Sequence, residues 1–216
     1  MYFARQSLGM SSVTDLHKAL AEIHLIRDQL ARHAEFRGYG PATLAATGAL
    51  ALLASAAQAH WLKDPGREIT LYLAIWIATA AVSLIIISIE TVMRTRRIHS
   101  ILAMEMIHSA LDQFLPAIVA GLLLTVVLWR CAPQSLWILP GLWQVLFSMG
   151  VFASCRFLPR PIFAVGVWYL AAGLTCLALG GARALSPWAM GLPFGIGQLL
   201  VASVLQFGYR NADEDS

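Results

Sequence analysis

The chain has 216 residues, of which 58% are hydrophobic and only 12% are charged, and its formal net charge is +3. Its mean hydropathy of +0.68 lies outside the range of ordinary water-soluble domains, which argues against a soluble enzyme or binding module. The small positive charge is a weak sign of nucleic-acid binding, and no nucleic-acid partner is expected. The composition instead predicts an integral membrane protein whose main partner is the lipid bilayer.

The first 41 residues are predicted to form a separate cytoplasmic region. Within residues 12–37, apolar side chains recur at helical spacing with charged side chains between them, which is typical of an amphipathic helix. The apolar stripe must cover something: the membrane surface, the inner loops of the same chain, a second subunit, or another protein. We predict that residues 12–37 bind a cytoplasmic protein partner or form a homo-oligomer.

Six apolar runs with at most one charged residue each follow, and each is about long enough to cross a hydrocarbon core of roughly 30 Å as a helix. They cover residues 42–62, 70–92, 112–129, 136–155, 161–182 and 187–208. The predicted fold class is therefore all-α: a polytopic membrane helix bundle of six transmembrane helices with a cytoplasmic amphipathic N-terminal helix. Because no short apolar core with a cleavage site precedes the first run, no cleaved signal peptide is expected.

The distribution of Lys and Arg predicts the orientation of the bundle. With the N-terminus inside, eleven of the fifteen Lys and Arg residues lie in inner segments and four lie in outer loops. This excess satisfies the positive-inside rule. We predict a protein of the cell inner (plasma) membrane with both termini in the cytoplasm, the second of them an acidic tail over residues 211–216.

The second half of the chain has the pattern of a duplicated hairpin. Phe-Leu-Pro at 114–116 recurs at 157–159, and a Leu-Pro pair followed by Gln occurs at 139–144 and again at 192–198. Matches in the same order predict parallel repeats of one helical hairpin. The predicted units are a first transmembrane hairpin with a cytoplasmic linker helix (42–111), a second hairpin (112–155) and a third hairpin (156–210).

Two stretches carry a loose family resemblance. Ser186-Pro187-Trp188 at the start of an apolar run resembles the signature of bacterial membrane proteins with SPW repeats. The stretches CRFLPRP and SPWAMGLPFG are also similar to uncharacterised bacterial six-helix integral membrane proteins. The resemblance implies a bacterial inner membrane, and it carries over no functional residue.

The stretch EMIHSALD places Glu105, His108 and Asp112 on one face of a helix. Glu-x-x-His is half of the motif with which helical di-iron proteins bind metal, and the chain has no second copy of it. A mononuclear metal site would borrow a ligand from His99, or ligands from the N-terminal region: His17, His24 and Asp28. We favour the other interpretation, a charged collar on the linker helix before the third span. No cofactor is assigned.

Glu90 is the acid that lies deepest in a predicted span, and Arg94 follows it by four residues. An ionisable group inside a span is a functional candidate. The spacing from Glu90 to Arg94 is the favourable one for an ion pair on a helix, so we predict a structural pair.

The repeat places Gln144 and Gln198 at equivalent positions, each following a proline. Buried amides need partners, so the two predict a hydrogen bond across the repeat or a shared ligand. Pro193 and Gly195 weaken the last helix between them, and interrupted helices are where transporters bind substrate. The competing interpretation is close helix packing through Gly191-x-x-x-Gly195.

The patterned polar surface is all on the predicted cytoplasmic side. The leading functional prediction is thus a non-enzymatic accessory or regulatory protein that docks a partner or a second subunit through its cytoplasmic face. The first alternative is a small transporter or lipid or small-molecule binder that uses the glutamine pair between the last two hairpins. The second alternative is a metal-dependent membrane enzyme that uses the EMIHSALD residues.

Overall fold

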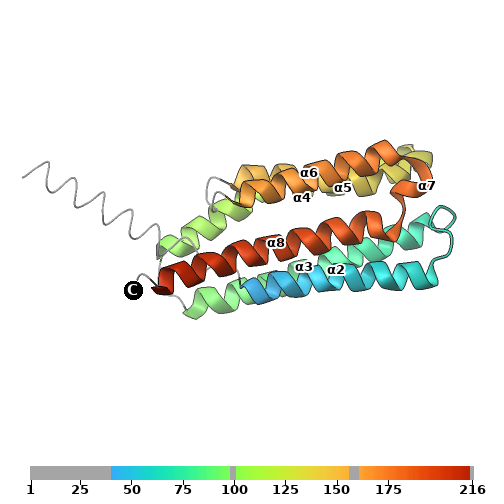
Figure 1. The fold of residues 1–216 in the computed structure, drawn as a ribbon. Helices are drawn as coiled ribbons and strands as arrows, with labels where there is room; N and C mark the ends of the chain where they lie inside the picture. The colour runs from blue at the N-terminus through green and yellow to red at the C-terminus, as the bar shows by residue number, and fades with distance from the viewer. Residues whose placement is uncertain (1–39, 98–100, 156–160, 215–216) are drawn as a thin grey trace, which may run out of the picture.

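The computed structural model describes residues 40–97, 101–155 and 161–214, without the side chains of residues 94–111 and 207–214. Every regular element in these ranges is a helix, and the described part of the chain holds no strand (Figure 1). In chain order the elements are α2 (Pro41–Trp61), α3 (Ile69–Arg97), α4 (Ile101–Cys131), the 3-10 helix η1 (Pro133–Ile138), α5 (Leu139–Ser154), α6 (Ile162–Leu179), α7 (Gly181–Ala184) and α8 (Pro187–Glu214).

The structure has six helices that are long and apolar enough to cross a membrane, which confirms a multi-pass membrane protein. Their apolar stretches are Pro41–Trp61, Ile69–Met93, Asp112–Cys131, Pro133–Ser154, Ile162–Leu179 and Gly181–Gln206. The shortest has 18 residues, about 27 Å at a rise of ~1.5 Å per residue, close to the thickness of the hydrocarbon core. Two of the stretches include a short helix before the main one, since η1 precedes α5 and α7 precedes α8.

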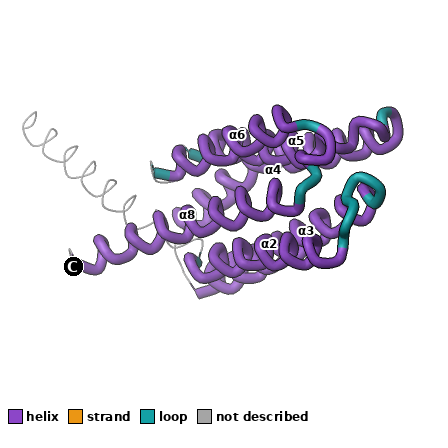
Figure 2. The backbone as a smooth tube through the Cα atoms, turned by 45° about the vertical axis from the view of Figure 1, so that its right-hand side comes forward, coloured by secondary structure: helices purple, strands orange, loops and turns teal. Residues whose placement is uncertain are grey.

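The six long helices form an open series in which each packs against the next: α3, α2, α8, α6, α5 and α4. α8 lies in the middle, between the α2–α3 pair and the group of α4, α5 and α6 (Figures 1 and 2). The most extensive contacts are those of α2 with α8 and of α5 with α6. Within the described residues, α3 and α4, the two ends of the series, do not pack along each other.

Consecutive spans do pack in pairs, α2 with α3, α4 with α5 and α6 with α8. The equivalence of these pairs as repeats stays a prediction, as does the amphipathic helix over residues 12–37, which lies outside the described residues. We call the end of the bundle with the α2–α3 connection the Trp61 end, and the opposite end, where α2 begins, the Pro41 end.

The contact between α2 and α8 depends on glycines that let the two backbones approach. A Cβ on Gly191 would collide with Ser55, and a Cβ on Gly195 would lie 2.6 Å from Leu52 Cγ. From the other side, a Cβ on Gly48 would lie 3.0 Å from the carbonyl oxygen of Gly195. Such small-residue contacts let membrane helices pack by dispersion alone, because lipid supplies no hydrophobic force between them.

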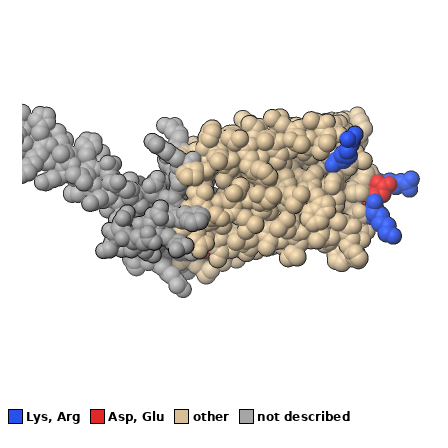
Figure 3. All heavy atoms as spheres, viewed as in Figure 1, with Lys and Arg blue, Asp and Glu red and all other residues tan. Residues whose placement is uncertain are grey.

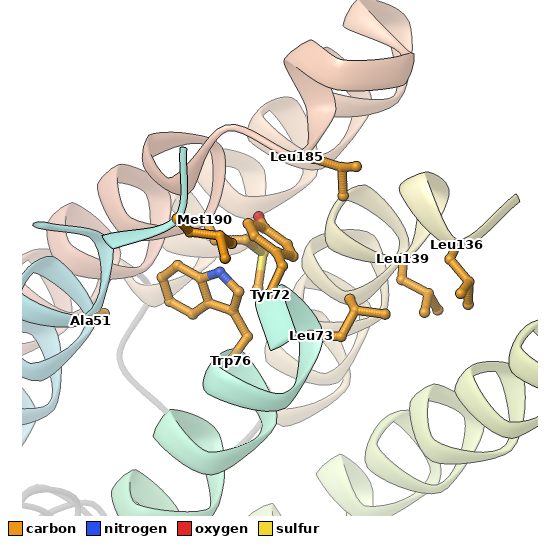
Figure 4. Packing of buried hydrophobic residues seen from close by; sticks show 9 residues of the cluster. Ala51, Tyr72, Leu73, Trp76, Leu136, Leu139, Leu185 and Met190 are labelled. Atoms are coloured by element: carbon orange, nitrogen blue, oxygen red, sulfur yellow. The ribbon is translucent and has the colours of Figure 1, made fainter. Parts of the chain in front are cut away.

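The main buried cluster closes the Trp61 end. Figure 4 shows the rings of Tyr72 and Trp76 from α3 beside Met190 from α8. Leu136 of η1 and Leu139 of α5 belong to the same cluster, so both halves of the bundle meet there. A smaller cluster of Leu44, Ala202 and Leu205 joins α2 to α8 near the Pro41 end.

Charged side chains are kept to the ends of the bundle. Apart from Glu90 and Asp112, those with described side chains lie on the exposed surface of the Trp61 end (Figure 3). They are Lys63, Asp64, Arg67, Glu68, Arg130 and Arg183. The stretches between the ends are apolar, which is the surface that lipid chains can contact.

Candidate functional site

The predicted metal residues lie on one continuous helix. α4 runs from Ile101 to Cys131, so Glu105, His108 and Asp112 occupy successive turns of it. Asp112 is exposed, and the other two side chains lie outside the described residues, as do His17, His24 and Asp28. Among the described residues, no group of three His, Cys, Asp or Glu residues could hold a metal ion. The metal site therefore stays a prediction.

Glu90 and Arg94 are one turn apart on α3, which is helical to Arg97. Glu90 is half-buried, and the side chain of Arg94 is not described. The spacing fits the predicted ion pair, which stays a prediction.

Gln198 and Gly195 lie on the side of α8 that faces α2. A Cβ on Gly48 of α2 would lie 3.0 Å from the Cβ of Gln198, and Gly195 packs on Leu52. Gln198 itself is half-buried. This part of the predicted site thus belongs to the close contact between α2 and α8.

Gln144 lies at a different contact, where α5 approaches α8. It occupies the buried stripe of α5 together with Gly141 and Ser148, and its side chain is fully buried. Gly173 of α6 leaves the space that it fills, because a Cβ there would lie 3.0 Å from the Gln144 Cβ. The structure therefore places the two predicted glutamines at separate interfaces of α8.

Pro193 explains what Gln144 does at this contact. An α-helical N–H donates to the carbonyl four residues earlier, and proline has no N–H, so Pro193 leaves the carbonyl of Ala189 without its usual donor. The Gln144 Nε2 donates to this same oxygen at 2.9 Å. The indole Nε1 of Trp168 on α6 donates to the Pro193 carbonyl at 3.0 Å. Side chains from α5 and α6 thus bond the backbone of α8 on either side of the proline.

A set of polar groups from three helices meets at the Trp61 end, and we call Gln58, Tyr72, Trp76 and Gln144 the polar junction. Gln58 Nε2 donates to the Tyr72 carbonyl at 3.1 Å, and the Tyr72 hydroxyl donates to the Ser186 carbonyl at 3.4 Å. Gln144 Nε2 also contacts Met190 Sδ at 3.5 Å. Met190 packs against Tyr72 and Trp76 (Figure 4), so it links the two sides of the junction.

Three atoms of the polar junction have no hydrogen-bond partner among the described residues: Gln58 Oε1, Trp76 Nε1 and Gln144 Oε1. Their side chains are 1%, 4% and 0% exposed, respectively. The Trp76 N–H lies beside the Tyr72 hydroxyl but does not reach hydrogen-bond geometry with it. A buried polar atom without a partner costs about 1–3 kcal/mol, so three such atoms on side chains linked through Tyr72 and Met190 need a physical reason.

The surroundings of the junction are uncharged. Among the described side chains, no Asp, Glu, Lys, Arg or His is buried. The nearest charges lie at the exposed Trp61 end, where Asp64 pairs with Arg67 at 3.3 Å. The junction can therefore form hydrogen bonds but cannot neutralise a charged group.

Tyr169 is a fourth buried group without a hydrogen-bond partner in the described part of the chain. Its ring lies between Phe147 at 4.6 Å and Phe194 at 5.2 Å, measured between ring centroids. A Cβ on Gly197 would collide with its hydroxyl, so that hydroxyl faces the backbone of α8. Gly197 is two turns beyond Met190 on α8, and Tyr169 lies one turn before Gly173, which packs on Gln144.

Sequence reasoning found Gln144 and missed the other members of the junction. Gln58 lies in an apolar run without a proline or a repeat to mark it. Tyr72 and Trp76 lie in the apolar run over residues 70–92, where no neighbouring motif distinguishes them. A signal was present, since Gln58 is the one glutamine within the first predicted span. What the sequence could not show is that the Trp61 ends of α2, α3 and α5 converge.

Comparison of the chain with protein-family models, with curated proteins and with solved structures found no match. The resemblance to SPW-repeat membrane proteins and the bacterial origin that it implies therefore stay predictions.

Proposed function

We propose that this protein binds a small uncharged molecule, or carries it through the membrane, at the polar junction. The observation that carries the proposal is the pair of fully buried glutamine carbonyls, Gln58 Oε1 and Gln144 Oε1, without hydrogen-bond donors in an apolar surrounding. A ligand that donates to both would offset the cost of burying them. This is the binder predicted from Gln144, with Gln58, Tyr72 and Trp76 in place of Gln198.

The position of the junction supports the same proposal. Ligand sites of membrane helix bundles lie between helices, where free backbone groups are available for bonding. α8 is continuous from Pro187 to Glu214, so the predicted interruption is absent, but Pro193 leaves one carbonyl of the helix without its usual donor. Here Gln144 is bonded to the carbonyl that Pro193 leaves free. A ligand that engages Gln144 would therefore act directly on the bond that joins α5 to α8.

The test is to extract the protein from its own membrane in polymer discs and record its native mass spectrum. We expect a bound species of discrete mass on the wild type that Gln144→Leu no longer retains. Gln206→Leu is the matched control, because Gln206 is an exposed amide near the Pro41 end of α8. If wild type and Gln144→Leu carry the same species at the same occupancy, the proposal is wrong.

Docking through residues 12–37 is the second proposal, and its support is the amphipathic pattern of the sequence. It places the protein in the inner membrane with that region in the cytoplasm, as the distribution of Lys and Arg favours. Deleting residues 1–37 should remove co-purifying proteins or change the oligomeric state in size-exclusion chromatography with light scattering. An unchanged oligomer with unchanged partners would contradict it.

A further inference from the structure

The polar junction shares Tyr72 and Trp76 with the buried cluster of the Trp61 end. Toward the Pro41 end, α3 and α4 carry exposed apolar side chains. Trp76 of α3 belongs to the buried cluster, and Leu128 of α4 packs against the same cluster. Both ends of the open helix series, α3 and α4, thus reach this buried cluster. The cluster also includes Leu73, Leu136 and Leu139, which are at most 4% exposed.

Away from this cluster, α3 and α4 bury almost none of their side chains. No residue of α3 from 77 to 93 is buried, and none is buried in the Asp112–Cys131 stretch of α4. The large side chains there are apolar and exposed, such as Leu84 at 51%, Leu122 at 60% and Leu123 at 61%. α3 and α4 do not pack along each other in the described residues. The exposed apolar surface of α3 begins at Ile77, the residue after Trp76.

The junction selects for the chemistry of the group that it holds. Two carbonyl oxygens require donors, and one indole N–H requires an acceptor. A hydroxyl group donates one hydrogen bond and accepts others, so two hydroxyl groups together can donate to both carbonyls and accept from the indole N–H. An ionised head group would be costly, because the described interior offers no charged partner. A site with hydrogen-bonding groups beside a lipid-facing apolar surface fits a molecule that has a polar head group and an apolar chain.

We infer that the ligand is an uncharged lipid whose head group carries two hydroxyls, held by Gln58, Trp76 and Gln144, and whose acyl chain lies along the apolar surfaces of α3 and α4. This inference rests on the proposed function, since it names the class of ligand for the same site. The lipid enters sideways from the bilayer, and the cluster at the Trp61 end blocks the route from water.

Three probes separate the head group from the acyl chain: monooleoylglycerol, dioleoylphosphatidylglycerol and free glycerol. Each is titrated into delipidated full-length protein in detergent and followed by native mass spectrometry. We expect monooleoylglycerol to bind saturably at one copy per protein, and the charged lipid and glycerol to bind at least tenfold more weakly. Gln144→Leu should weaken the binding of monooleoylglycerol by roughly tenfold, the upper effect of losing one buried hydrogen bond. Gln206→Leu should not change it.

Gln58→Leu is the second variant, because Gln144→Leu also removes the bond to α8 and its loss of binding could follow from misfolding. A tenfold loss in Gln58→Leu with an unchanged thermal unfolding midpoint would support the inference. If glycerol binds equally well, the acyl chain contributes nothing to the affinity. If the charged lipid binds equally well, the site does not select the head group. Either result overturns the inference and leaves the proposed function standing.

If none of the three probes binds while the species from the native membrane persists, the ligand is not a lipid of this class and the inference falls alone. If that species is missing as well, and only water fills the junction, the proposed function falls with it.

Discussion

The two sides of α8 are held by different kinds of contact. Toward α2, the helix presents Gly191 and Gly195, and its backbone lies against Ser55 and Leu52 at distances that leave no room for a methyl group. Toward α5 and α6, it is joined by hydrogen bonds from Gln144 and Trp168 to the backbone around Pro193. The contact with α2 is mainly a close approach of backbones, with one hydrogen bond from Ser55 Oγ to the Pro187 carbonyl at 2.9 Å. The contact with α5 and α6 adds two bonds to the backbone around Pro193 to the close approach of Tyr169 to Gly197.

The difference shows where the bundle can change. A glycine contact loses its dispersion energy as soon as the backbones separate, so α2 and α8 should move as one body. Hydrogen bonds to a proline-freed carbonyl can be exchanged for bonds to a ligand at small net cost. The α5–α8 side is therefore where binding and movement are expected, and the α2–α8 side is the rigid frame.

The largest effect is expected from Gly191→Ala. The added Cβ collides with Ser55, so the substitution should destabilise the protein by about 3 kcal/mol. Unfolding in mixed detergent measures this loss. Ser55→Gly should recover part of it in the double variant, whereas Gly121→Ala, whose Cβ would make an ordinary 3.7 Å contact with Leu146, should be neutral or slightly stabilising. Equal losses at Gly191 and at Gly121, which faces α5 from α4, would mean that the loss at Gly191 does not come from the close approach of α8 to α2.

Gln144→Leu should cost about 2 kcal/mol, because it leaves the Ala189 carbonyl buried without a donor. Pro193→Ala restores the helical N–H that bonds this carbonyl. The cost of Gln144→Leu should therefore fall by about half or more in a Pro193→Ala background, as a double-mutant cycle of unfolding free energies. Additive costs would mean that Gln144 does not act through the carbonyl that Pro193 frees.

Trp168→Phe should have a smaller effect, about 1 kcal/mol, because the ring volume is largely kept and one hydrogen bond to the Pro193 carbonyl is lost. Thermal unfolding of this variant measures the contribution of α6 to the contact. Trp188→Phe is the control, since Trp188 is 43% exposed and should change the midpoint little. A larger loss at Trp188 would contradict the assignment.

The three free cysteines report whether the α6 side opens. Cys131 is exposed, Cys155 is half-buried and Cys176 is buried, so maleimide should label them in that order. Burial raises the pKa of the Cys155 thiol, and the thiolate is the reactive form. The rate at Cys155 should therefore be low at neutral pH and keep rising as the pH passes the ordinary thiol value of about 8.5. Labelling of Cys176 that rivals Cys131 would show that α6 separates from its neighbours freely.

The same labelling tests the predicted orientation in intact cells. An impermeant maleimide should reach Cys131 from outside, at the Trp61 end, and Cys155 only after permeabilisation. The reverse pattern would place the termini outside the cell.

Much of the fold was predictable, because the length of an apolar run is a direct consequence of bilayer thickness. All six spans fall within a few residues of their predicted positions. The order of neighbours was not predictable in the same way. Hairpins follow from short connections, but the pairing of α2 with α8 depends on matching Gly48 against Gly195 across 147 positions of sequence, and no local pattern encodes that match.

The candidate site was predictable only in part. Gln144 stands out because an amide in an apolar run needs a partner, and Pro193 stands out because it breaks a helix. That the two interact could not be read from their positions in the repeat, which pointed to Gln198 instead. Gln58 and Trp76 became candidates only when the Trp61 ends of α2, α3 and α5 were brought together, because burial without a partner is a property of the assembled bundle.

The central place of α8 has a consequence for how the protein is made. α8 follows the other five spans in the chain, so during synthesis α2 must wait in the membrane with Gly48 and Ser55 facing lipid or a chaperone until α8 emerges. The two halves can therefore reach their final arrangement only after the last span is inserted. A cell that interrupts translation before residue 187 would hold a set of helices lacking the shared neighbour that joins them, and such a product should be a ready substrate for membrane quality-control proteases.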